Sequence, residues 1–231
     1  MKRSHELYLH EEVLLLALRD EQGTIASGSM FTYAMGGAIL AELLLRERVA
    51  VDETSRRKLV NVVDTKRTGD PVLDECLKLM REAKRRKPMQ GWVTKFATTR
   101  GLRDRVALGL CRRHILKADE GRVLMLFKRK IYPECDPAPE RAIVKRLRRA
   151  IFSETRDVDA RTLVLVSLAN SANVLSMVFE KRELRARKAR LKLLASEESA
   201  GEAASAATAA IRAAQAAVAM MIVTTTVISS N

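Results

Sequence analysis

The stretch DARTLVLVSLANSANVLSMVF, residues 159–179, decides the class of fold. It is apolar along most of its length and contains neither proline nor glycine. A helix that is apolar on most of its sides is buried, so we expect these residues to form a helix at the centre of the core. The flanking segments RAIVKRLRRAIF (residues 141–152) and KRELRARKARLKLLASE (residues 181–197) are charged and amphipathic. They predict two helices that pack against the outside of this core.

The composition favours a mainly α-helical protein. The chain has 231 residues, of which 47% are hydrophobic and only 4% aromatic, so aliphatic side chains must build the core. Residues that favour helices are abundant and proline is scarce. The length suits one large domain or two small ones, and it is sufficient to bury a substantial core. Residues 1–6 are predicted to be a short disordered basic tip.

Further helices and one or two β-hairpins are predicted along the chain. Apolar periodicity and stop residues predict helices at about residues 6–23, 38–46, 71–87 and 103–116. Residues 49–51 predict a strand that returns just after residue 58. A second hairpin is predicted within residues 115–132, with its turn at Asp119–Gly121 and its return strand at Val123–Phe127.

The C-terminal run AAIRAAQAAVAMMIVTTTVISS resembles a membrane span only superficially. Arg212 and Gln215 interrupt it and leave about 15 apolar or small residues, whereas a span needs about 20. We interpret residues 203–231 as an Ala-rich helix packed in the core, with a membrane tail anchor as the alternative. Near the N-terminus, polar residues such as Glu6 interrupt any apolar core of a signal peptide.

The net charge of +14 is confined to the middle of the chain. Residues 81–149 hold 21 Lys or Arg and 7 Asp or Glu, whereas the two ends together sum to zero. A charge excess confined to under a third of the chain predicts a basic surface that attracts a polyanion or an anionic membrane. The alternative is a face that only confers solubility.

No strong catalytic or metal-binding pattern occurs in the sequence. The HExxH, GxxxxGK[ST], GxGxxG and GxSxG motifs are absent, and the three cysteines lack the spacing of a zinc site. Asp70, Asp74 and Glu75 form a tight acidic group, which we interpret as the first turn of a helix rather than an acid–base pair. We therefore predict neither enzymatic activity nor a cofactor or metal.

Three arginines near one helix start suggest an anion site. Arg100 and Arg103 share one side of the helix if it has begun by Arg100, and guanidinium groups bind phosphate oxygens in a bidentate manner. Free backbone N–H groups at a helix start would add to such a site. Alternatively, these arginines and Arg105 pair with Asp104 or with other surface carboxylates, and the spacing alone does not decide.

Several motifs occur in an order that resembles the Golgi phosphoprotein 3 family. They are LYLHEEVLLLALRDEQG (residues 7–23), GGAILAELLLRERV (residues 36–49), TGDPVLDECLKLM (residues 68–80), TRGLRDRVALGL (residues 99–110) and LANSANVL (residues 168–175). The resemblance covers about residues 7–220, and the compact, Ala- and Arg-rich chain looks like a short, bacterial-type relative. It implies one compact domain over residues 1–231, in which amphipathic helices wrap a central bundle of apolar helices. It also implies a peripheral membrane protein that binds phosphatidylinositol 4-phosphate.

The resemblance also implies a set of lipid-binding residues. The family's Arg-x-x-Arg pair corresponds to Arg100 and Arg103. A further arginine of the family corresponds to Gly36, and a tryptophan corresponds to a position near Ser27, so this chain differs from the family at both positions. Arg105 and Lys95 would add phosphate contacts. The hairpin residues expected to insert into the membrane or to mediate self-association through residues 115–132 are Leu124, Met125, Leu126 and Phe127. The alternative for these four is a strand that faces the core.

Together these observations predict a cytoplasmic protein that associates reversibly with an anionic membrane surface. The alternative is a nucleic-acid-binding regulator, because a helix followed by a hairpin at residues 38–64 and again at residues 102–132 is similar to the units of a winged helix. The absence of a clear recognition helix argues against it.

Overall fold

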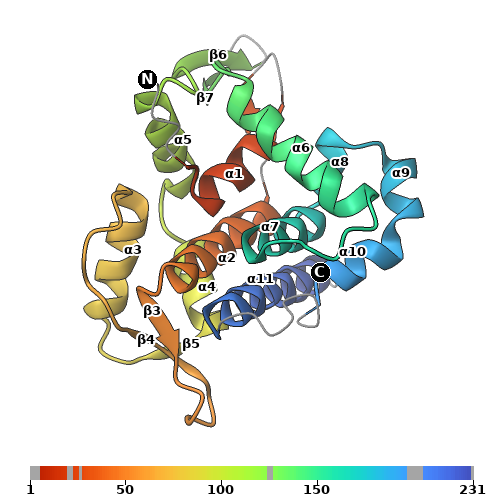
Figure 1. Cartoon of the computed structure of the whole chain (residues 1–231). Helices are drawn as coiled ribbons and strands as arrows, with labels where there is room; N and C mark the ends of the chain where they lie inside the picture. Colours follow the sequence, from red (N-terminus) through yellow and green to blue (C-terminus); the bar gives the residue numbers. More distant parts are fainter. Residues whose placement is uncertain (1–5, 20–22, 26–27, 124–126, 197–204, 230–231) are drawn as a thin grey trace.

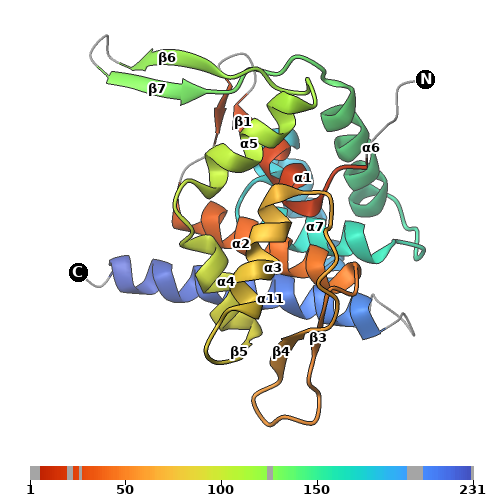
Figure 2. The same ribbon diagram turned by 90° about the vertical axis from the view of Figure 1, so that its left-hand side faces the viewer.

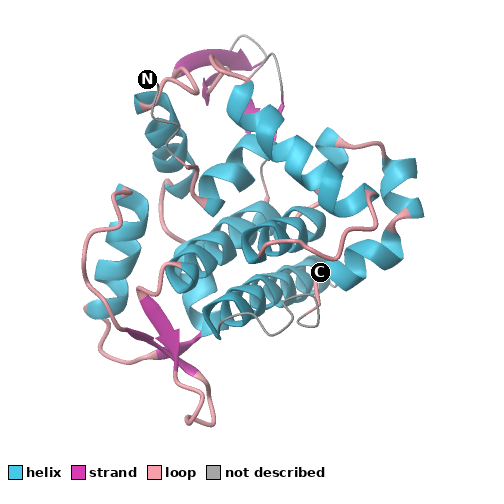
Figure 3. Ribbon diagram, in the orientation of Figure 1, coloured by secondary structure: helices cyan, strands magenta, loops and turns pink. Residues whose placement is uncertain are grey.

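The computed structural model describes residues 6–19, 23–25, 28–123, 127–196 and 205–229. This part of the chain is mainly α-helical with small antiparallel sheets (Figure 3), which confirms the predicted fold class. In chain order the elements are α1 (Leu9–Leu16), β1 (Leu18–Arg19), β2 (Thr24–Ile25), α2 (Ser29–Leu45), β3 (Val49–Val51), β4 (Leu59–Val62), α3 (Pro71–Arg81), β5 (Lys87–Pro88), α4 (Met89–Ala97), α5 (Leu102–Arg112), β6 (Asp119–Val123), β7 (Phe127–Ile131), α6 (Ala138–Phe152), α7 (Ala160–Ser171), α8 (Leu175–Val178), α9 (Lys181–Ala186), α10 (Lys188–Leu194) and α11 (Ser205–Ser229).

Helices α2, α7 and α11 pack together at the centre of the molecule (Figure 1), and α4 lies against α2 and α11. Small residues permit this close approach. A Cβ atom at Gly37 would lie 2.6 Å from Cβ of Ala217 on α11, and α11 presents the fully buried Ala210, Ala213 and Ala214. The Ala-rich segment is therefore part of the core over its described first half. None of the described helices is long and apolar enough to cross a bilayer.

The stretch at residues 159–179 lies in the core as predicted, but it is not one helix. The side chains from Leu163 to Leu168 are buried in α7. The helix ends where Asn173 takes a left-handed conformation with φ of 59°. The Val174 N–H then donates to the Ala169 carbonyl at 2.8 Å, the arrangement of a Schellman motif, and α8 follows.

Several predicted helix boundaries are wrong because turns and strand pairing override periodicity. The first helix stops at Leu16, and Gly23 instead occupies a turn between β1 and β2 with φ of 58°. A Cβ at Gly23 would lie 2.2 Å from the backbone nitrogen of Pro133, so only glycine fits this contact. Helix α2 begins at Ser29, well before the predicted start.

Helix α3 begins as predicted, because Asp70 accepts from the Leu73 N–H at 2.7 Å and Pro71 occupies the first turn. It ends at Arg81, before the predicted stop at Pro88. The residues after it instead add a short strand to the first hairpin, since Lys87 pairs with Val60. The predicted helix at residues 181–197 is likewise interrupted and forms α9 and α10.

The two predicted hairpins are present, but the register of the second one is wrong. Strands β3 and β4 pair from Val49↔Val62 onwards. Asp119–Gly121, predicted as the turn, lie in β6 opposite residues 129–131 of β7, and the pairing extends to Val123↔Phe127. Glu120 faces Lys130, and such an opposite-charge pair stabilises a ladder. Figure 2 shows this hairpin projecting from the body beyond α5. Residues 124–126 lie outside the described residues.

Candidate anion-binding site

A pocket of about 210 Å³ lies where the start of α2 meets the turn between α4 and α5. It contains the N-terminal ends of two helices, because Gly28 is the N-cap of α2 and Gly101 is the N-cap of α5. The pocket is lined by Gly28, Phe31, Thr32, Ala97, Thr99, Gly101, Leu102, Arg103 and Asp104. It therefore combines backbone donors, threonine hydroxyls, one arginine and one carboxylate.

Neither helix start in this pocket carries a side-chain cap. The first N–H groups of a helix have no intrahelical acceptor, and the helix dipole places partial positive charge there. A Cβ atom built on Gly28 or on Gly101 would meet nothing within 4 Å, so the backbone is open on this side. Two such helix ends beside a guanidinium group favour a bound anion.

Of the predicted pair, Arg103 lines the pocket and Arg100 does not. Arg100 is exposed in the turn that leads into Gly101. Arg103 has a side chain 37% exposed, and its Nε lies 4.0 Å from Oδ1 of Asp104. Both arginines thus lie at the start of α5, and one of them faces the cluster of backbone donors.

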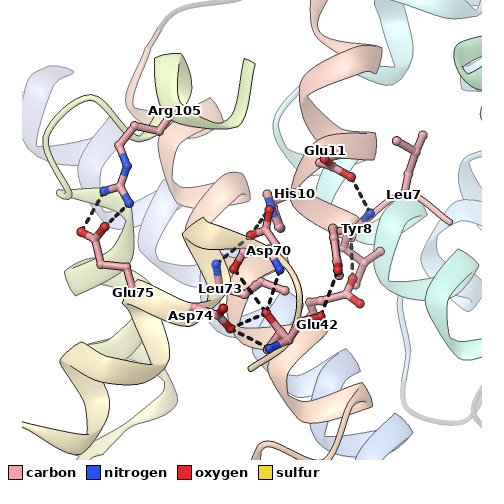
Figure 4. A network of polar contacts seen from close by, with 12 residues as sticks. Leu7, Tyr8, His10, Glu11, Glu42, Asp70, Leu73, Asp74, Glu75 and Arg105 are labelled. Carbon is pink, nitrogen blue, oxygen red and sulfur yellow. Dashed lines mark hydrogen bonds and ion pairs between the residues drawn. The ribbon is translucent and has the colours of Figure 1, made fainter. Parts of the chain in front are cut away.

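Arg105 points toward α3 rather than into the pocket. Its Nη1 donates to Oε1 of Glu75 at 2.8 Å, and its Nη2 contacts the second oxygen of the same carboxylate (Figure 4). This is the pairing with a surface carboxylate that the sequence left open. Lys95 is exposed on α4 and does not line the pocket.

Gly36 is buried where α2 crosses α4 and does not line the pocket. A Cβ at this position would lie 2.6 Å from the carbonyl oxygen of Val93 and 3.0 Å from the backbone nitrogen of Ala97. The position therefore has no room for an arginine in this packing. Ser27 lies outside the described residues, but Gly28, which follows it directly, does line the pocket.

The chain also matches known proteins over most of its length. A family model described as Golgi phosphoprotein 3 (GPP34) matches residues 9–214.

The chain belongs to the Golgi phosphoprotein 3 family.

Two curated relatives are named "Vacuolar protein sorting-associated protein 74". The protein from Eremothecium gossypii is 30% identical over 220 residues, which cover 78% of this chain and 65% of the relative. The protein from Schizosaccharomyces pombe is 27% identical over 219 residues, which cover 79% and 64%. This chain therefore spans a little less than two thirds of these relatives.

Within this Golgi phosphoprotein 3 domain, the sequence did not point to several residues of the pocket. Phe31 and Thr32 lie outside the quoted motifs, Thr99 only begins one of them, and none of the three was predicted as a site residue. The available signal was the recurrence of a glycine directly before a helix, at Gly28 and at Gly101. Of the predicted hairpin residues, Leu124, Met125 and Leu126 lie outside the described residues, and Phe127 begins β7.

The acidic group on α3 is structural, as predicted (Figure 4). Asp70 caps the helix, Asp74 accepts from the Thr68 N–H and hydroxyl at 2.7 Å each, and Glu75 binds Arg105. Nε2 of the fully buried His10 lies 3.4 Å from Oδ1 of Asp70. These contacts tie α3 to α1 and α5. Among the described residues no cluster of His, Cys, Asp and Glu could hold a metal ion.

Proposed function

We propose that this chain is a peripheral membrane protein that binds phosphate-bearing phospholipid headgroups, of the phosphatidylinositol 4-phosphate type. It acts from the cytoplasm, associates reversibly with the membrane surface, and has no enzymatic activity. The observation that carries this proposal is the convergence of Gly28, Gly101 and Arg103 on one pocket. In that pocket a phosphate would accept from two helix starts and one guanidinium group.

The positive charge of residues 84–100 supports the same function. Exposed cations with no carboxylate partner among the described residues precede α4 at Lys84, Arg85 and Lys87, and continue with Lys95 and Arg100. Each such cation near an anionic leaflet contributes about 1 kcal/mol. Membrane binding would thus combine a general attraction, which salt weakens, with one specific phosphate contact.

Membership of the Golgi phosphoprotein 3 family supports a function at a membrane surface. The resemblance of this chain to members that bind phosphatidylinositol 4-phosphate suggests the headgroup. Because Gly36 stands where the resemblance places an arginine, phosphate recognition in this pocket would rest on backbone groups and Arg103. We therefore expect the selectivity for a phosphomonoester over a simple anionic lipid to be modest. The exposed cations should supply a large part of the free energy of membrane binding.

Vesicle flotation tests this function. The chain should float with phosphatidylcholine vesicles that contain phosphatidylinositol 4-phosphate, should do so less at high salt, and should not float with phosphatidylcholine alone. Arg103→Gln should weaken binding about tenfold, the loss expected for one charge-assisted phosphate contact. Arg182→Gln, an equal change of charge on exposed α9, should have little effect.

Two results would contradict the proposal. If the chain floats with no anionic vesicle, the function is wrong, and if Arg103→Gln binds as well as the parent, the site is wrong. A gel-shift titration with duplex DNA examines the alternative of a nucleic-acid-binding regulator, which would show tight binding with a steep dependence on salt.

A further inference from the structure

A carboxylate lies inside the proposed headgroup pocket. Among the described residues that line it, Asp104 carries the only negative charge. Its Oδ1 is buried, has no hydrogen-bond partner in the described part of the chain, and lies 4.0 Å from Nε of Arg103. A buried carboxylate oxygen needs compensation. The Arg103 guanidinium group contributes charge to this carboxylate, and the Tyr132 side chain contributes a hydrogen bond to it.

Asp104 also contacts the hairpin that follows α5. Its Oδ2 lies 3.9 Å from Nζ of Lys130 on β7. Tyr132, just after β7, is buried, and burial together with the Asp104 carboxylate raises its pKa to about 12. The phenol therefore stays neutral, and it donates a hydrogen bond to the Asp104 carboxylate without adding charge. Arg103 and Lys130 each lie near the 4.0 Å upper limit of an ion pair with Asp104. The carboxylate is therefore shared between Arg103 in the pocket and Lys130 on the hairpin.

We propose that Asp104 competes with the bound phosphate for Arg103, and that Lys130 on the hairpin relieves this competition. The inference rests on the proposed function, because it concerns the same pocket. In the free protein Arg103 neutralises Asp104. When Arg103 turns toward a phosphate, Asp104 loses that charge and also repels the ligand, and Lys130 is the cation placed to compensate it.

This arrangement makes headgroup affinity depend on the position of the hairpin. A contact that draws Lys130 toward Asp104 strengthens phosphate binding, and one that draws it away weakens binding. By linkage, phosphate binding then also favours the hairpin arrangement in which Lys130 lies against Asp104. The charge of Asp104 is thus a regulatory element of the site rather than a ligand to the phosphate.

The first test measures the affinity of the full chain for inorganic phosphate by calorimetry and for vesicles with phosphatidylinositol 4-phosphate by flotation. Asp104→Asn should bind both probes roughly three- to tenfold more tightly, because a repulsive charge is gone and Arg103 is free. Asp157→Asn is the matched control, since this exposed carboxylate lies in the loop between α6 and α7. It makes the same change of net charge and should alter affinity less than about twofold.

The second test is a double-mutant cycle with Lys130, measured on inorganic phosphate to exclude direct contact with a membrane. Lys130→Gln should weaken phosphate binding about two- to fivefold in the parent chain. In the Asp104→Asn background the same substitution should have no effect, because the carboxylate through which Lys130 acts is absent. If Lys130 instead acts on the phosphate independently of Asp104, Lys130→Gln would weaken phosphate binding equally in both backgrounds.

The outcomes separate this inference from the proposed function. If the parent binds and Asp104→Asn binds no more tightly, the inference is wrong and the function stands. If only Asp104→Asn binds, the inference stands and the parent is self-inhibited rather than constitutively lipid-binding. If neither protein binds phosphate or vesicles, both are overturned. Thermal unfolding of every variant confirms that the compared proteins are folded.

Discussion

Arg161 on α7 and Glu42 on α2 form an ion pair inside the protein, with 2.9 Å between Arg161 Nη2 and Glu42 Oε2. The Glu42 side chain is fully buried and also accepts from the Leu9 N–H at 2.7 Å and from Nε of Arg46 at 2.6 Å. Arg161 further approaches Glu12 of α1, at 3.7 Å between Nε and Oε2. One arginine therefore joins three helices of the core.

The same network extends to the helices that surround α1. Arg146 on α6 donates to Glu12 at 2.9 Å, and Arg113, just after α5, donates to Glu11 at 2.7 Å. The carboxylates of Glu11 and Glu12 are almost completely buried, whereas the arginines are partly exposed. This charged network fixes how α5, α6 and α7 are oriented around α1, and α5 carries the candidate site.

Replacing Arg161 should therefore destabilise the fold strongly. Arg161→Met leaves Glu42 and Glu12 with less compensation, and breaking a buried pair by removing one partner costs about 3–5 kcal/mol. Arg105→Met, which removes the more exposed pair with Glu75, is the matched control and should cost within about 1 kcal/mol. Denaturant unfolding measures both, and equal losses would contradict the importance of the internal pair.

Glu42 should make stability depend on pH in the acid range. Burial alone would raise its pKa, but the Arg161 charge and the hydrogen bonds from Arg161, Leu9 and Arg46 outweigh burial and hold the pKa below the ordinary value of 4.5. A lowered folded-state pKa contributes stability above 4.5, which is lost as the pH falls below it. The free energy of unfolding of the parent minus that of Glu42→Gln should thus decrease as the pH falls from 6 to about 3.

Glu12 should show the opposite dependence although it belongs to the same network. Burial raises its pKa above 4.5 despite the nearby Arg146 and Arg161. With a raised folded-state pKa, the parent gains stability as the pH falls toward 4.5, and Glu12→Gln lacks this gain. The free energy of unfolding of the parent minus that of Glu12→Gln should therefore increase as the pH falls. Unfolding curves at several pH values test both carboxylates, and slopes of the same sign would contradict the assignment.

Gly36 should tolerate no side chain. Gly36→Ala places a Cβ 2.6 Å from the carbonyl oxygen of Val93, which is backbone and cannot move aside cheaply, so we expect a loss of about 1–3 kcal/mol. Gly109→Ala on α5 is the control, because its Cβ would meet no atom closer than 4.0 Å. That substitution should stabilise the helix by up to about 1 kcal/mol. Thermal unfolding distinguishes the two, and a neutral Gly36→Ala would contradict the packing.

The sequence predicted what depends on local pattern and failed where distant segments meet. The central location of residues 159–179 follows from their apolar pattern, and the start of α3 follows from Pro71 and the acidic group beside it. The early end of α1 could not be predicted, because Gly23 serves a contact with Pro133, more than a hundred residues away.

The candidate site shows the same division. The place of Arg103 near a helix start left its role open, and the family resemblance together with the basic middle of the chain favoured it as a site residue. Arg105 was left open because nothing local reveals that Glu75 of α3 reaches it. Gly28 became part of the site only through the packing of α2 beside the turn between α4 and α5. The burial of Glu12 and Glu42 was also hidden, since a buried charged residue needs a partner and their shared partner Arg161 comes from a distant helix.

The central claim is that a phosphate binds between the starts of α2 and α5, and backbone amide NMR tests it most directly. The isotope-labelled chain would be titrated with inositol 1,4-bisphosphate, the soluble headgroup of phosphatidylinositol 4-phosphate. We predict that the largest saturable shifts occur at the amides of Gly28, Gly101, Arg103 and Asp104, and that Arg103→Gln reduces them. Shifts confined to the Lys84–Lys87 cluster or to α6 and α9, or no saturable shift at all, would contradict the account.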